Sequence, residues 1–125
     1  MVKKTEKPVA LPPEAQQMLM QLQAFRQQLQ ALALQKESLQ IQKLENEKAL
    51  EELGKTKQGE DVFRAVGPIL IKSSKKKMEK ELKERNESID LRLKTFEKQE
   101  AAVNQRVMEL QKKLQQMLSG TETAG

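Results

Sequence analysis

Hydrophobic residues recur at alternating spacings of three and four along two long stretches of the chain, one on each side of a short central segment. Such spacing places side chains on one stripe of an α-helix, which is the heptad pattern of a coiled coil. The first stripe comprises Ala15, Met18, Leu22, Phe25, Leu29, Leu32, Lys36, Leu39, Lys43, Asn46, Leu50 and Leu53. We therefore expect a helix over residues 12–54, with two prolines in its first turn and Gly54 at its end.

The middle of this first stripe is polar, and a second apolar row runs beside it. The polar members are Lys36, Lys43 and Asn46, and the neighbouring row is Leu34, Ile41 and Leu44. Two interpretations remain open at this point. Either the stripe shifts register there, or the second row faces a different neighbour.

The second stretch repeats more regularly. Its two rows are Leu82, Ile89, Phe96, Val103, Leu110 and Met117, with the companions Asn86, Leu93, Glu100, Val107 and Leu114. This pattern predicts a helix over residues 74–118, capped at its start by Ser73 or Ser74. We expect residues 1–11 to form a disordered lead-in and residues 119–125 a disordered tail.

The segment between the helices has a different character, with β-branched residues on both sides of Gly67-Pro68. Val and Ile favour strands, and a Gly-Pro pair marks a turn. We expect a loop followed by a hairpin within residues 55–73, with strands over residues 61–66 and 69–73. The predicted fold is mainly α, with the two helices folded back into an antiparallel coiled coil and Leu50 opposite Leu82.

A hairpin of two strands is marginally stable in water, and both of its edges carry unpaired backbone groups. This hairpin is also apolar on both faces. We therefore expect hairpins from several chains to join edge to edge; the alternative is that the hairpin only reverses the chain. The residues of this predicted assembly element are Val62, Phe63, Val66, Gly67, Pro68, Ile69, Leu70 and Ile71.

The end of the predicted coil away from the hairpin is apolar and poor in charge. Residues 8–35 hold two charged side chains and eight Gln, and four of the six Met lie at this end. Met is flexible and suits promiscuous binding surfaces. Leu19, Met20, Met108 and Leu118 fall outside the heptad stripes, so we expect them to bind a partner. The alternative is that the apolar residues here only close the coil, which applies in part to the stripe positions.

Composition excludes several classes of protein. With 37% hydrophobic and 2% aromatic residues the chain cannot fill a thick core, and it has no Cys and no His. No phosphate-binding loop and no carboxylate cluster is present, so we expect no catalysis, cofactor or metal. No signal peptide or membrane-spanning run is apparent, which favours a cytoplasmic protein without membrane contact.

The central segment and its flanks resemble the β subunits of archaeal prefoldin. The resemblance rests on Phe63-Arg-Ala-Val-Gly-Pro-Ile-Leu-Ile-Lys72, on Leu50-Glu-Glu-Leu53 and on Ile89-Asp-Leu-Arg-Leu-Lys-Thr-Phe-Glu-Lys-Gln-Glu100, and it extends from about Leu11 to Leu118. It implies a hexamer of two α and four β subunits, in which the hairpins build a central β-barrel. It also implies that the coil tips hold non-native proteins without ATP and deliver them to a group II chaperonin.

The resemblance assigns the client-binding tip to one set of residues in this chain. These are Leu11, Met18, Leu19, Met20, Leu22, Phe25, Val107, Met108, Leu114, Met117 and Leu118. The partners it implies are a prefoldin α subunit, other β subunits, unfolded clients and the chaperonin.

Two alternatives to a co-chaperone belong to other classes. The net charge of +5 and the basic run from Lys72 to Lys77 favour a coiled-coil scaffold that binds nucleic acid or another helical partner. The scarcity of aromatic residues argues against the nucleic acid, because it removes stacking contacts. A plain dimeric coiled-coil spacer is the third interpretation.

Overall fold

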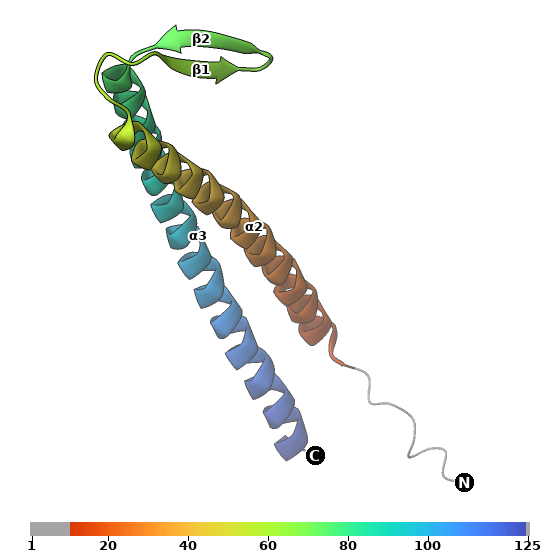
Figure 1. Ribbon diagram of the computed structural model, residues 1–125. Helices are drawn as coiled ribbons and strands as arrows, with labels where there is room; N and C mark the ends of the chain where they lie inside the picture. The colour runs from red at the N-terminus through yellow and green to blue at the C-terminus, as the bar shows by residue number, and fades with distance from the viewer. Residues whose placement is uncertain (1–10, 125) are drawn as a thin grey trace. The chain divides into compact units, whose positions relative to one another are not determined.

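A computed structural model describes the backbone of residues 11–124 and the side chains of residues 11–119. Its elements are helix α2 (Pro13–Lys55), strands β1 (Val62–Val66) and β2 (Ile69–Ser73), and helix α3 (Lys75–Ala124) (Figure 1). The expected class, two long helices with a small antiparallel hairpin between them, is confirmed. The disorder predicted for residues 1–10 and for residue 125 falls outside the described residues.

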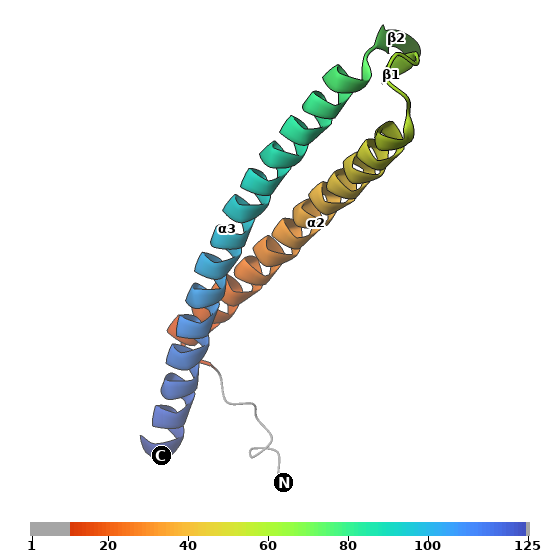
Figure 2. The same ribbon diagram turned by 60° about the vertical axis from the view of Figure 1, so that its left-hand side comes forward.

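The chain divides into two compact units, and each is described by itself. The hairpin unit is Leu32–Lys98, and it contains the end of α2, the hairpin and the first part of α3. The terminal unit is Met1–Ala31 with Gln99–Gly125, and it contains the start of α2 and the rest of α3. In both units α2 and α3 run in opposite directions along the chain (Figure 2).

The heptad stripe of α2 keeps one register through its polar middle. Lys36, Lys43 and Asn46 are half-buried, as stripe positions should be, whereas the neighbouring apolar row is exposed. The apolar core of the hairpin unit consists of Leu32, Leu39, Leu53, Leu82 and Ile89. Of the two interpretations left open by the sequence, the shift of register is therefore wrong, and the row of Leu34, Ile41 and Leu44 is exposed on a face turned away from α3.

A polar layer crosses this core. The Asn46 side-chain amide donates a hydrogen bond of 2.9 Å to Oδ1 of Asn86, in the register predicted from Leu50 and Leu82. At the stripe position of α2 that precedes Asn46, Lys43 Nζ lies 2.7 Å from Asp90 Oδ1. An Asn pair inside a coil favours one alignment of the helices over shifted ones, at some cost in stability.

The Lys43–Asp90 pair also has a consequence for titration. The hydrogen bond and the negative charge of Asp90 raise the pKa of Lys43 above its ordinary value. Because the folded-state pKa is raised, the pair's contribution to stability is complete below the ordinary pKa of lysine. It is lost as the pH rises through the raised value.

The core of the terminal unit is thinner. Ala15, Leu22 and Val103 are buried, and stripe residues such as Phe25 and Val107 are half-buried. Because two helices bury only one stripe from each, the other side chains of these segments meet solvent.

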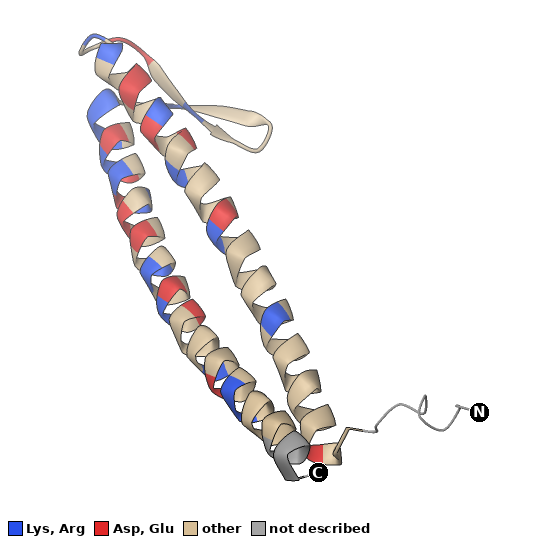
Figure 3. Ribbon diagram, turned by 90° about the horizontal axis from the view of Figure 1, so that it is seen from below, with Lys and Arg blue, Asp and Glu red and all other residues tan. Residues whose placement is uncertain are grey.

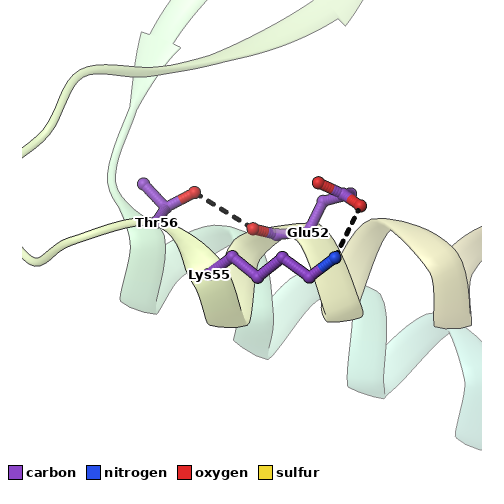
Figure 4. A network of polar contacts seen from close by, with 3 residues as sticks. All are labelled: Glu52, Lys55 and Thr56. Atoms are coloured by element: carbon purple, nitrogen blue, oxygen red, sulfur yellow. Dashed lines mark hydrogen bonds and ion pairs between the residues drawn. The ribbon is translucent and has the colours of Figure 1, made fainter.

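Helix α2 extends one residue past the predicted end at Gly54. The hydroxyl of Thr56 donates to the carbonyl oxygen of Glu52 at 3.1 Å, and Lys55 Nζ lies 3.5 Å from Glu52 Oε1 (Figure 4). The Thr56 hydroxyl and the Thr56 N–H, which donates to the Leu53 carbonyl oxygen at 3.1 Å, satisfy carbonyls of the last turn without a left-handed residue. Gly54 therefore keeps a negative φ, and the described glycines with positive φ are Gly59 and Gly67.

Helix α3 begins as predicted, with Ser74 as its cap. The Lys77 backbone N–H donates to Ser74 Oγ at 3.2 Å, and the Met78 N–H donates to the Ser74 carbonyl oxygen at 2.9 Å. Lys75 Nζ then donates to the Thr56 carbonyl oxygen at 2.8 Å. This bond ties the start of α3 to the end of α2.

The far end of α3 differs from the prediction. We expected the helix to stop at residue 118, before Ser119-Gly120, but it continues to Ala124. A glycine inside a helix costs only about 1 kcal/mol relative to alanine, so Ser119-Gly120 weakens the helix without ending it. Between Leu118 and Ala124 there is no proline and no residue with positive φ, so the backbone hydrogen bonding continues.

Removal of the Ser74 cap tests this account of the helix start. We expect Ser74→Ala to lower the free energy of unfolding by about 1 kcal/mol, because one N–H of the first turn loses its acceptor. The measurement is urea unfolding followed by circular dichroism at fixed protein concentration. Ser88→Ala, at an exposed position inside α3, is the control and should leave stability unchanged or slightly higher.

The polar layer gives a second prediction, with opposite signs for single and double variants. Asn46→Leu should destabilise the coil by about 1 kcal/mol, because Asn86 is left half-buried without its partner. Asn46→Leu with Asn86→Leu should restore or exceed the original stability, because an apolar pair replaces the polar one. Thermal unfolding of the three proteins measures both effects, and additive losses in the double variant would contradict the pairing.

Candidate functional site

The terminal unit carries more apolar residues than its coil can bury. Leu19 directly follows the stripe residue Met18, and Met20 comes one position later. On α3, Met108 follows Val107 and Leu118 follows Met117 in the same way. Since each residue turns the helix by about 100°, a residue just after the stripe points away from the partner helix.

The exposure of these side chains agrees with that geometry. Met20 is 70% exposed and Met108 is 67% exposed, and three leucines are exposed to a smaller extent. We call these five residues the terminal apolar set; its members are Leu11, Leu19, Met20, Met108 and Leu118. The residues expected from the sequence to bind a partner are thus exposed.

The remaining residues of the expected tip belong wholly or partly to the coil. Leu22 is only 4% exposed and is part of the core of the terminal unit. Five others are half-buried, so each presents only an edge to solvent; they are Met18, Phe25, Val107, Leu114 and Met117. While α2 and α3 are packed together, Leu22 lies beneath this surface and cannot contact a bound partner.

The surroundings of the terminal apolar set are neutral on α2. From Pro13 to Ala31 only Glu14 and Arg26 are charged, and this part of α2 is almost entirely tan in Figure 3. Gln side chains supply hydrogen bonds of either kind without fixing a charge pattern. A neutral surface with exposed Met has the character of surfaces that accept varied apolar segments.

Sequence analysis missed part of the surroundings of Met108. A shallow hollow on α3 is lined by Met108 together with Ala101, Asn104 and Gln105. These residues lie within about two helical turns of Met108, on the face turned away from the stripe. A small residue one heptad before Met108, at Ala101, was the signal that could have indicated this hollow.

The hairpin is the second surface of interest. The paired residues are Val62 with Ser73, Phe63 with Lys72, Arg64 with Ile71, Ala65 with Leu70 and Val66 with Ile69. Gly67 has a φ of 58° and Pro68 is restricted to negative φ, which is the sign pattern of a type II′ turn. Such a turn matches the twist of its strands and holds this register.

Apolar side chains cover both faces of the hairpin and remain exposed. Val66, Ile69 and Ile71 share one face, and Phe63 and Leu70 share the other. All five are exposed. The described part of the sheet has two strands, so each strand also has a free edge.

One ion pair joins the hairpin to α3, and a second lies within the base of the hairpin. Arg64 Nη1 lies 3.5 Å from Glu81 Oε1 on α3, and Lys72 Nζ lies 3.3 Å from Asp61 Oδ1. Val62, near the same base, is half-buried. The hairpin is thus anchored at one end and apolar at the other, which suits an assembly element.

The basic run from Lys72 to Lys77 is largely structural. Lys72 pairs with Asp61, and Lys75 donates to the Thr56 carbonyl oxygen. Lys76 and Lys77 are exposed at the start of α3. Because two of the four lysines hold the hairpin base, this run offers little free positive charge for a nucleic-acid backbone.

Other kinds of site were sought in the described residues. Among them, no three acidic, His or Cys side chains come together in an arrangement that could hold a metal ion. Neither α2 nor α3, where described, includes a segment apolar enough to cross a bilayer.

Comparison with known proteins places these surfaces in a family context. The family model described as "Prefoldin subunit" matches residues 16–121. The prefoldin subunit beta of Archaeoglobus fulgidus is 42% identical over 109 residues, covering 87% of this chain and 94% of that protein. The corresponding subunit of Methanococcoides burtonii is 44% identical over 112 residues, covering 90% of this chain and 95% of that protein.

A solved structure is similar as well. The crystal structure of the prefoldin beta subunit from Thermococcus strain KS-1 aligns with a TM-score of 0.79 and 37% identity. The alignment covers 85% of this chain and 93% of that one. The similarity therefore includes both helices and the hairpin between them.

Proposed function

This chain belongs to the prefoldin subunit family, and we propose that it acts as the β-type subunit of a hexameric prefoldin that holds non-native proteins without ATP. Family members are chaperone subunits and not enzymes, so no catalytic step is part of the proposal. One observation supports it most directly. Ten of the fourteen large apolar residues that are exposed in the described part of the chain lie in the hairpin or in the terminal unit, where the proposal needs an assembly element and a binding surface.

The hairpin is the proposed assembly element. Its two free edges carry backbone donors and acceptors that a neighbouring strand would satisfy, and its exposed faces would be covered in a closed barrel. The proposed assembly contains two α subunits and four β subunits, which fill one barrel with their hairpins. Closure removes every edge, and this explains why an apolar hairpin is tolerated in a chain with such high charge.

The terminal apolar set is the proposed capture surface. Each exposed side chain offers a small apolar area, so one coil binds a client weakly. Several coils in one assembly bind several segments of the same client, and the gain from multivalency replaces a deep pocket. The half-buried tip residues widen the surface, and Leu22 becomes available only where the two helices separate.

Delivery of the client to a group II chaperonin completes the proposal. Weak contacts at several points allow release one contact at a time, so hand-over needs no nucleotide. A cytoplasmic location fits such a partner.

A charge in the hairpin tests the assembly. We expect Val66→Asp or Ile69→Asp to dissociate the hexamer formed with an α subunit, because a carboxylate cannot enter an apolar barrel without a partner. Native mass spectrometry measures the assembly, and circular dichroism should find the helix content unchanged.

The control for this experiment is Leu91→Asp, which places the same charge on an exposed residue of α3. It should leave the hexamer intact. A hexamer that survives Val66→Asp and Ile69→Asp would remove the hairpin from its proposed role.

Substitution in the terminal apolar set tests capture. The double variant Met20→Gln with Met108→Gln should need about a tenfold higher concentration to suppress client aggregation, because the loss of each weak contact multiplies across the coils. Light scattering of a chemically unfolded client during dilution gives the measurement.

Leu91→Gln is the matched control, since Leu91 is equally exposed but lies in the hairpin unit. It should suppress aggregation as well as the original protein. If the double variant also does so while its hexamer is intact, the capture surface lies elsewhere, and the assembly role is unaffected.

A further inference from the structure

A third apolar surface lies on α2 within the hairpin unit, apart from the hairpin and from the terminal apolar set. Leu34 is 61% exposed, and Ile41 and Leu44 are each 51% exposed. Their spacing of seven and then three residues puts them on one face of α2, opposite the seam with α3. We call these three residues the α2 stripe. It spans about 15 Å along the helix, or nearly three turns.

The charges around the α2 stripe are mostly of one sign. Glu37 lies on the same face between Leu34 and Ile41. Further exposed carboxylates follow along α2 toward the hairpin. Between Glu37 and Lys55, Lys48 is the one cation that is exposed. The additional carboxylates are Glu45, Glu47, Glu51 and Glu52. Lys36 and Lys43 lie on the seam side, where Lys43 is already paired with Asp90.

We propose that the α2 stripe binds an amphipathic helix of another protein whose apolar seam is flanked by Lys or Arg. The spacing of the three residues is that of a coiled-coil seam, which accepts side chains of a facing helix between its own. Glu45 and Glu47 lie where flanking charges of such a helix would fall, and a basic residue facing Glu37, which lies within the row, would fix its alignment. The bound helix becomes the third helix of the coiled coil in this unit.

Other occupants fit the surface less well. An extended segment gains its affinity from backbone bonds to a sheet edge, and the backbone of α2 is already bonded within the helix. The exposed carboxylates of Glu37, Glu45 and Glu47 repel a nucleic acid or an anionic membrane. Two copies of the chain packed stripe to stripe would bring those carboxylates face to face.

The α2 stripe also differs in kind from the terminal apolar set. The terminal set is nearly neutral on α2, as Figure 3 shows, and it makes little distinction between partners. The α2 stripe has a fixed charge pattern, and charge complementarity provides specificity and a fast association rate. The two surfaces therefore select different ligands, one by hydrophobicity and the other by charge.

Binding of two synthetic helical peptides to the full-length chain tests the proposal. Both peptides carry Leu at heptad spacing; one has Lys at the flanking positions and its twin has Glu. We expect the Lys peptide to bind at least about tenfold more tightly than the Glu peptide, with affinity falling as salt increases. Fluorescence anisotropy measures affinity, and NMR shifts of the Leu and Ile methyl groups locate the site.

The variants decide where the peptide binds. Leu34→Gln with Ile41→Gln and Leu44→Gln should abolish binding of the Lys peptide, and Leu91→Gln should not change it. These four positions are exposed, so the coil should keep its helix content, which circular dichroism checks.

Three results would overturn the proposal: equal binding of the two peptides, binding retained by the triple variant, or methyl shifts confined to the terminal apolar set. A lower assembly mass of the triple variant without peptide would also overturn it. That result would make the α2 stripe an interface between copies.

Discussion

Two helices wound together share a single seam, and this limit governs the exposure of apolar residues in the molecule. A stripe of heptad positions on each helix can be buried, and an apolar residue elsewhere on either helix must face solvent or another molecule. The buried residues of α2, from Ala15 to Leu53, all occupy the stripe. The apolar residues outside it are numerous enough to form separate surfaces, so they point to partners and not to the stability of the lone chain.

The hairpin is subject to a related limit. Two strands cannot cover both faces of their own sheet or satisfy both edges. Arg64 and Lys72 hold the base through ion pairs, and Val62 is half-buried there. Beyond that base the apolar side chains are exposed on both faces, and this is the reason for proposing that the hairpin joins other chains.

The periodicity of the sequence predicted most of this arrangement because the coil uses one repeating contact. Lys36, Lys43 and Asn46 looked like a possible break, since polar residues rarely lie in a seam. Asn46 and Lys43 meet partners forty or more residues away, Asn86 and Asp90, which no local pattern reveals. The end of α3 was missed for a different reason. A Ser-Gly pair weakens a helix only slightly, and the backbone bonds continue past it to Ala124.

The candidate surfaces were predictable to different extents. Residues directly after a stripe residue, such as Leu19 and Met108, are exposed by the turn of the helix itself, so the sequence sufficed. The α2 stripe was recognisable in the sequence as a row of apolar residues. Its exposure could not be predicted until the structure showed that the seam between α2 and α3 keeps one register. Its flanking carboxylates then gain a role in the proposal, because they lie on a surface turned away from α3, where a bound helix could meet them. A coil with one seam thus separates stability from recognition: substitutions on the outer face alter partners, and substitutions in the seam alter the fold.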